Sequence, residues 1–161
     1  MIMNKKVSIL MGSKSDLDIM NKAADMLKQF NIDYDINVLS AHRTPHETIE
    51  FVENSNSDVF IAGAGGAAHL PGVVAGITTK PVIGVPIKAS ISIAGIDSLL
   101  SIVQMPPGVP VASVGVDGAK NAGILAAQMI GIADKEVQEK LISFKKEQRE
   151  MVLESNNAIA R

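Results

Sequence analysis

Residues 34–53 read Y-D-I-N-V-L-S-A-H-R-T-P-H-E-T-I-E-F-V-E, a strand pattern that passes within a few residues into a helix pattern. Apolar residues alternating over 34–40 predict a β-strand. Thr44 is a plausible N-cap and Pro45 a favoured first residue for a helix over 45–53. Repetition of this β-α unit along the chain decides the fold.

The same unit occurs four more times. Strands are predicted at 6–11, 59–64, 81–87 and 109–114. The helices after them are expected from an N-cap at Ser15 or Asp16, from about Leu70, near 95–104 and over 119–132. Alternation of strands and helices implies right-handed crossovers and a doubly wound parallel sheet, so we predict an α/β fold.

A further helix is predicted over 134–155, one more than the sheet requires. Its apolar residues form one stripe beside the charged run K-K-E-Q-R-E. The stripe consists of Val137, Leu141, Phe144 and Val152. We expect this extra C-terminal helix to pack on the domain or on a neighbouring subunit.

Composition narrows the class of protein. The chain has 161 residues, 15 Lys and Arg against 17 Asp and Glu, and no cysteine. Its length predicts a single domain over 1–161. The absence of a basic block argues against a nucleic-acid partner. No apolar stretch approaches the roughly 20 residues that span a bilayer, and the start lacks a signal-peptide pattern. We expect a cytoplasmic protein without a membrane partner.

Four loops at the predicted carboxyl ends of strands are rich in polar residues or glycine. They are M-G-S-K-S-D (11–16), S-A-H-R-T-P (40–45), A-G-A-G-G-A-A-H-L-P-G (62–72) and K-A-S-I-S (88–92). In open parallel sheets, ligands bind outside the carboxyl ends of the strands. We therefore expect these loops to meet at one site.

Two of these loops suit an anionic ligand. Ser13 and Asp16 could form only a tight turn and a helix cap, or they could bind phosphate and sugar hydroxyls. Arg43 suits a phosphate, and His42 beside it suits acid-base chemistry; a capped helix start with a solvated Arg is the less favoured alternative. His46 is expected to be an exposed surface residue.

The third loop contains small residues followed by His69. Close packing of strand and helix would explain them, but small residues also let a substrate approach backbone amides. A metal site at His42 and His69 is not favoured, because no Asp, Glu or further His stands at ligand spacing beside either.

Together, M-G-S-K-S-D, S-A-H-R-T-P, A-G-A-G-G-A-A-H-L-P-G and the later D-S-L-L-S-I-V-Q-M-P-P-G-V-P-V resemble the bacterial class I PurE family over residues 6–155. These enzymes are the 5-(carboxyamino)imidazole ribonucleotide mutases of purine biosynthesis. The resemblance implies a flavodoxin-like three-layer α/β/α sandwich and a homo-octamer with sites between subunits.

The resemblance also implies an activity. The family moves a carboxylate from the exocyclic nitrogen of N5-carboxyaminoimidazole ribonucleotide to ring carbon 4, with CO2 as a confined intermediate and without metal, ATP or biotin. It implies a functional link to the ATP-dependent synthetase of that substrate. His42 would be the acid-base residue. Substrate would be bound by Ser13, Asp16, Ser40, Arg43 and backbone at Gly65, Gly66 and Ala67, with His69 supporting.

Two positions depart from the family pattern, and alternatives remain. Many members carry Gln at the position of Lys88 and Arg at that of Pro107, so contacts there are expected to differ. A related class II carboxylase would use CO2 directly. A flavodoxin-like binding module for flavin, or a phospho-receiver, is less favoured, because rim aromatics and the receiver's acidic and lysine residues are missing from the loops.

Overall fold

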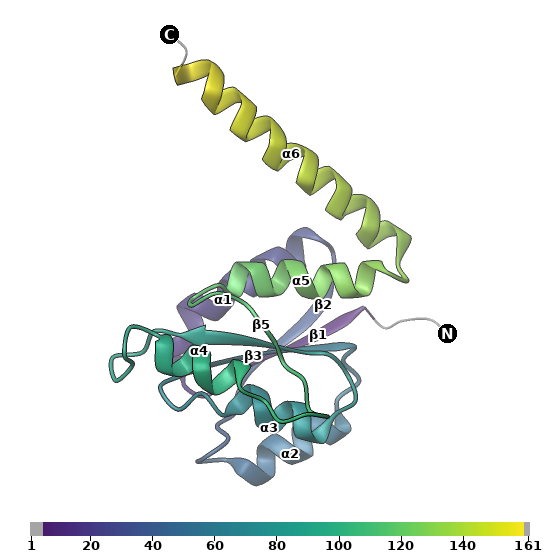
Figure 1. Cartoon of the computed structure of the whole chain (residues 1–161). Coiled ribbons are helices and arrows are strands. Elements are labelled where there is room, and N and C mark those ends of the chain that lie inside the picture. The colour runs from purple at the N-terminus through teal and green to yellow at the C-terminus, as the bar shows by residue number, and fades with distance from the viewer. Residues whose placement is uncertain (1–4, 160–161) are drawn as a thin grey trace.

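The computed structural model describes residues 5–159, so the ends of the predicted domain, 1–4 and 160–161, lie outside the described residues. Five strands alternate with helices, as the sequence predicts (Figure 1). The strands are β1 Lys6–Met11, β2 Asp33–Val38, β3 Val59–Gly65, β4 Val82–Ile87 and β5 Ala112–Ser113. The helices are α1 Leu17–Gln29, α2 Pro45–Asn54, α3 Leu70–Ile77, α4 Ile96–Val103, α5 Ala119–Gly131 and α6 Lys135–Ile159, with a short 3-10 helix, η1, at Lys14–Asp16.

All strand pairs are parallel, and the strand order is β2-β1-β3-β4-β5. This is the order of flavodoxin-like sheets, so the predicted α/β/α architecture is confirmed. Helices α1 and α5 cover one face of the sheet, and α2, α3 and α4 cover the other (Figure 1). The sheet is therefore the middle of three layers, and its inner strands β3 and β4 are apolar and almost entirely buried because both faces are covered.

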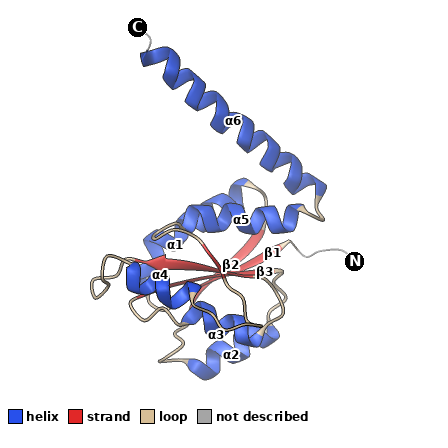
Figure 2. Cartoon of the chain, in the orientation of Figure 1, coloured by secondary structure: helices blue, strands red, loops and turns tan. Residues whose placement is uncertain are grey.

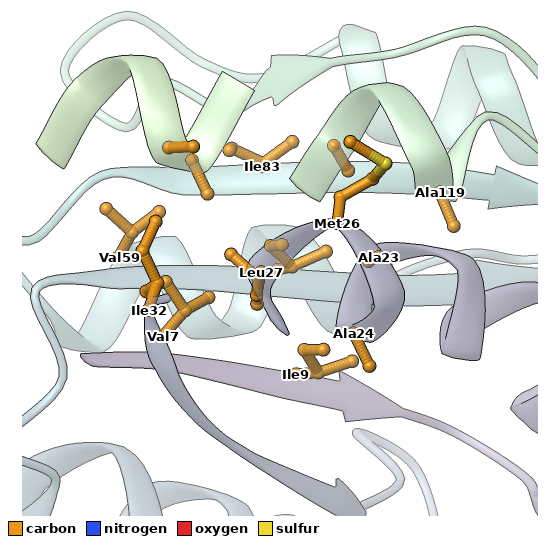
Figure 3. Close-up of a cluster of buried hydrophobic side chains, with 14 of the residues drawn as sticks. Val7, Ile9, Ala23, Ala24, Met26, Leu27, Ile32, Val59, Ile83 and Ala119 are labelled. Carbon is orange, nitrogen blue, oxygen red and sulfur yellow. The ribbon is translucent and has the colours of Figure 1, made fainter. Parts of the chain in front are cut away.

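Small residues hold the α1 layer close to the sheet and to α5. Val7 and Ile9 of β1 lie beneath Leu27 of α1 in the core (Figure 3). Where α1 meets α5, a Cβ added at Gly123 would lie 2.7 Å from the carbonyl oxygen of Ala23. Only glycine permits this approach of the two helices.

Strand β5 is much shorter than predicted. The expected strand covers 109–114, but only Ala112 and Ser113 pair, with Ile83 and Gly84 of β4. Pro110 has no N–H to donate to a ladder, and β5 lies at the edge of the sheet where little pairing is required. The prediction of a full strand was wrong for this reason.

Helix α6 is docked only at its start. Val137 and Leu141 are buried, and the Phe144 ring packs edge-on against Phe30 with ring centroids 5.6 Å apart. Val152, predicted to continue the stripe, is 64% exposed, and the distal part of the helix extends away from the domain (Figure 2). Three residues of the predicted stripe thus pack on the domain, and for Val152 the alternative of packing on a neighbouring subunit stays a prediction. Over residues 5–159, no helix combines the length and hydropathy needed to cross a bilayer.

Candidate active site

A cavity of about 280 Å³ opens at the carboxyl ends of the strands. It lies where β1 has β2 on one side and β3 on the other, which is the switch point of the strand order. The four loops singled out in the sequence all contribute to its lining. Of the nine candidate site residues, eight line it: Ser13, Asp16, Ser40, His42, Arg43, Gly65, Ala67 and His69.

The first loop turns through η1 and carries Asp16 into the cavity. Ser13 Oγ accepts hydrogen bonds from the Ser15 N–H at 3.3 Å and from Ser15 Oγ at 3.0 Å. Asp16 occupies the N-cap position of α1 as expected, but its side chain makes no cap hydrogen bond. The carboxylate accepts a 3.5 Å hydrogen bond from Ser15 Oγ and lines the cavity, where it can also receive a ligand.

Burial is the main influence on the pKa of Asp16. The residue is only 7% exposed, and this desolvation raises the pKa of its carboxyl above 3.8. Hydrogen bonds from the Ser13 backbone and the Ser15 hydroxyl, and the charge of Arg43, act in the opposite direction. A ligand that donates hydroxyl hydrogen bonds to this carboxylate would replace part of its lost hydration.

The second loop is fixed by Ser40 and Thr44. Thr44 is at the N-cap position of α2 and Pro45 follows it, as predicted, but the Thr44 side chain makes no cap bond. Its hydroxyl instead accepts from the Ser40 N–H at 2.8 Å and donates to the Ser40 carbonyl at 3.2 Å. The turn carrying His42 and Arg43 is thus closed on itself.

Arg43 joins the first two loops. Its Nη2 donates to the Gly12 carbonyl at 2.6 Å, and its Nε donates to Ser40 Oγ at 3.3 Å. The guanidinium is exposed and lines the cavity. Its unused donors can therefore meet an anion there.

The third loop brings His69 against His42. His42 Nε2 lies 2.7 Å from His69 Nδ1, and the two rings meet edge to face at 78° with centroids 4.8 Å apart. One of these nitrogens must carry the proton and the other must accept it. The pair is exposed to the cavity, which suits proton transfer to a bound molecule.

Glycines let the third and fourth loops approach each other. A Cβ added at Gly65 would lie 2.6 Å from Ala89 Cβ. Gly66, also a candidate site residue, does not line the cavity. It has a φ of +63°, and a Cβ there would lie 3.1 Å from Ile91 Cδ1. The sequence motif therefore serves close packing and ligand access together.

Several lining residues were not predicted. They include Ser15, Ala89, Ser90 and Ile91. The signal for Ser90 was the hydroxyl-rich stretch 88–92, and Ser15 stood in a loop already selected, whereas nothing in the sequence indicated Ile91. His46 is exposed in the first turn of α2 and does not line the cavity. Among residues 5–159, no three His, Asp or Glu side chains cluster closely enough to hold a metal ion.

The comparisons with known proteins all find similarity to one enzyme family. The family model described as AIR carboxylase matches residues 6–151. The chain is 55% identical to a protein of Thermotoga maritima named N5-carboxyaminoimidazole ribonucleotide mutase, covering 92% of this chain and 88% of that one. It is 50% identical to a protein of the same name from Methanocaldococcus jannaschii, covering 95% and 96%.

A plant relative and a solved structure extend the comparison. The chain is 46% identical to the chloroplastic phosphoribosylaminoimidazole carboxylase of Vigna aconitifolia, covering 95% of this chain and 28% of that one. The crystal structure of Treponema denticola PurE superposes with a TM-score of 0.85 at 32% identity, covering 97% of this chain and 99% of that one.

Proposed function

This chain belongs to the AIR carboxylase family, and we propose that it is an N5-carboxyaminoimidazole ribonucleotide mutase of purine biosynthesis. It converts N5-carboxyaminoimidazole ribonucleotide to 4-carboxy-5-aminoimidazole ribonucleotide. The observation that carries the proposal is the pairing of His42 with His69 in a cavity that also holds Arg43 and Asp16. This combination suits proton transfer to an anionic sugar phosphate.

The reaction needs two proton transfers, one to the substrate and one from it, so no net proton is consumed. Loss of CO2 from the exocyclic nitrogen requires a proton on that nitrogen. Attack of ring carbon 4 on CO2 forms the new carbon–carbon bond, and loss of the carbon-4 proton restores the aromatic ring. His42 supplies the first proton and accepts the second, so the residue returns to its starting state. His69 holds the His42 ring by the 2.7 Å hydrogen bond.

The remaining polar residues bind the ribonucleotide. Arg43 and Ser13 meet the phosphate, Asp16 accepts from sugar hydroxyls, and Ser40 orients the Arg43 side chain through its 3.3 Å hydrogen bond. Backbone at Gly65 and Ala67 approaches the ring, while Gly66 contributes through the shape of the loop. The support for these roles is that the polar groups converge on one cavity.

The small residues at the end of β3 and just after it would confine the CO2. Ala64, Gly65 and Ala67 line the cavity, and they offer neither bulk nor charge to an uncharged molecule. Gly63 and Ala68, on either side of this stretch, are buried and do not line the cavity. We expect a substitution that widens this wall to release free CO2 and lower the yield of product.

Direct carboxylation of aminoimidazole ribonucleotide is the second candidate, because one relative is named a carboxylase. The experiment supplies fresh N5-carboxyaminoimidazole ribonucleotide to the protein without bicarbonate and follows the carbon-carboxylated product. Turnover is expected. No turnover, with conversion of aminoimidazole ribonucleotide only at high CO2, would contradict the mutase and support the carboxylase.

The proposal extends to assembly and surroundings. We expect a cytoplasmic homo-octamer that receives its labile substrate from an ATP-dependent synthetase. Exposed apolar residues on α4 and α6, among them Leu100, Ile142 and Val152, support association between copies. Light scattering in solution tests the octamer, and a monomeric mass at micromolar concentration would contradict it. Co-elution or faster coupled turnover with the synthetase tests the link, which fails if neither occurs.

A further inference from the structure

The cavity has a roof that belongs to the fourth loop. Residues 88–95, here termed the roof loop, join β4 to α4, and Ala89, Ser90 and Ile91 within it line the cavity. Ile91 is 80% exposed although it lines the site. Hydrogen bonds within the loop, from the Ser92 N–H to the Ala89 carbonyl at 3.0 Å and from the Gly95 N–H to Ser92 Oγ at 2.8 Å, hold its shape. Its position over the cavity then depends on what holds its two ends.

One end of the roof loop is held by Asp117. The Asp117 carboxylate accepts a hydrogen bond from the Lys88 N–H at 2.9 Å. The Asp117 N–H donates to the Pro86 carbonyl at 2.8 Å. Both bonds connect Asp117 to the carboxyl end of β4, at the point where the roof loop begins.

The other end is held by the same turn. Residues 115–118, here termed the 115–118 turn, are closed by a 2.9 Å hydrogen bond from the Gly118 N–H to the Gly115 carbonyl. Val116 packs on Gly95, where an added Cβ would lie 2.5 Å from Val116 Cγ1. A single turn after β5 thus contacts both ends of the roof loop.

The backbone of Asp117 adopts a conformation that few residue types tolerate. Its φ is +56°, in the left-handed region that side chains other than Asn and Asp rarely adopt. The turn keeps this geometry while directing N–H and carboxylate toward β4. Residues held in such conformations gather at functional sites.

We propose that Asp117 is a positioning residue for the reaction. It acts through the roof loop. By holding the Lys88 N–H at the start of the loop, it fixes the positions of Ala89, Ser90 and Ile91 in the cavity lining. Gly65 and Gly66 complete the arrangement from below, because their missing side chains leave room for Ala89 and Ile91. The expected effect on catalysis rests on the proposed function. The attachment of the roof loop to Asp117 rests on geometry alone.

Two variants separate the carboxylate from the backbone. Asp117→Gly accepts the positive φ without strain but removes the acceptor for Lys88. Asp117→Asn keeps an acceptor oxygen and tolerates the left-handed conformation. Asp134→Ala is the matched control, because Asp134 accepts a backbone hydrogen bond from Val137 at 3.0 Å at the start of α6, away from the cavity.

The first measurement is steady-state kinetics with N5-carboxyaminoimidazole ribonucleotide. For Asp117→Gly we expect KM to rise roughly three- to tenfold, the factor for one lost hydrogen bond, with kcat within about twofold. Asp117→Asn is expected to restore KM to within about twofold of wild type, and Asp134→Ala to leave it unchanged. Equal KM values for wild type and Asp117→Gly would overturn the proposal.

The second measurement is amide hydrogen exchange without substrate. Faster exchange confined to Lys88–Ser92 is expected in Asp117→Gly but not in Asp117→Asn or Asp134→Ala. Unchanged exchange in that segment would show that Asp117 does not hold the roof loop. An inactive wild type would contradict the proposed function instead, and the exchange result would still decide whether Asp117 holds the loop.

Discussion

His42 Nε2 and His69 Nδ1 lie 2.7 Å apart, although 27 residues separate them in the chain. His42 is in the turn before α2, and His69 is the N-cap residue of α3. Because a neutral imidazole has one N–H and one acceptor nitrogen, this contact requires one ring to donate and the other to accept. In the proposed mechanism, His69 is therefore the residue that orients the His42 ring.

Replacing His42 by Asn is expected to abolish most turnover. Asn can hydrogen-bond but cannot exchange a proton near neutral pH, so kcat should fall by about 10²–10⁴-fold. His69→Asn, which keeps substrate contacts but loses the ring partner, should lose less. His46→Asn is the matched control, because His46 is exposed outside the cavity. Near-normal kcat in folded His42→Asn would contradict the assigned role.

Replacing Arg43 by Lys is expected to weaken substrate binding. The guanidinium donates to Gly12 and Ser40 at the same time, which a single ammonium at the end of a flexible stem does not reproduce. KM should rise about tenfold or more. Arg149→Lys on exposed α6 serves as control. The assignment fails if both variants bind substrate as tightly as wild type.

Replacing Asp16 by Asn is expected to stabilise the fold and impair binding. Desolvation raises the pKa of Asp16 above 3.8 in the folded state. Its favourable contribution to the free energy of unfolding is therefore complete below that pH and is lost as pH rises through the folded-state pKa. Asp16→Asn should raise Tm at about pH 7 and hardly change it at about pH 3.

The same Asp16→Asn variant should show a KM for the ribonucleotide raised by about tenfold or more, since a charged acceptor for sugar hydroxyls is lost. Differential scanning calorimetry at the two pH values checks the predicted change in Tm, and steady-state kinetics checks the predicted change in KM. A lower Tm at neutral pH would show that ligand-free Asp16 stabilises the fold, contrary to this account.

Replacing Gly65 by Ala is expected to displace the roof loop. The new Cβ would lie 2.6 Å from Ala89 Cβ and 3.1 Å from the Ile87 carbonyl oxygen, so Ala89 must move. We expect a loss of about 1–3 kcal/mol in unfolding free energy and a higher KM. Gly76→Ala in α3 is the control, because an added Cβ there meets nothing within 4 Å. That control should be stable by denaturant titration.

We expect the stabilisation that Asp134 gives to the start of α6 to be lost in acid. The Val137 N–H and then the Lys5 ammonium lower the pKa of Asp134 below 3.8. The stabilisation is present above the ordinary pKa and is lost as pH falls through the folded-state value. Asp134→Asn should lower Tm at about pH 7 but not at about pH 2. Glu150→Gln, an exposed carboxyl of the same helix, should have no effect; equal effects of both variants would refute the prediction.

Local chemistry determined much of this protein directly from sequence. The strand of residues 6–11 and the helix start at Pro45 appear where the pattern predicts them, because apolar periodicity and proline geometry act within a few residues. The polar loops at strand ends met at one cavity, since parallel strands place their carboxyl ends at one edge of the sheet.

Tertiary structure decided what no local pattern contains. The sequence could not show that His42 faces His69, that Thr44 turns back to Ser40, or that Asp117 reaches Lys88, because each contact depends on how separate loops are oriented after the layers pack. It could not show where α6 leaves the domain either. Periodicity specifies which residues prefer burial, but packing of α6 against α5 and against Phe30 at the end of α1 fixes how much of that preference this chain satisfies by itself.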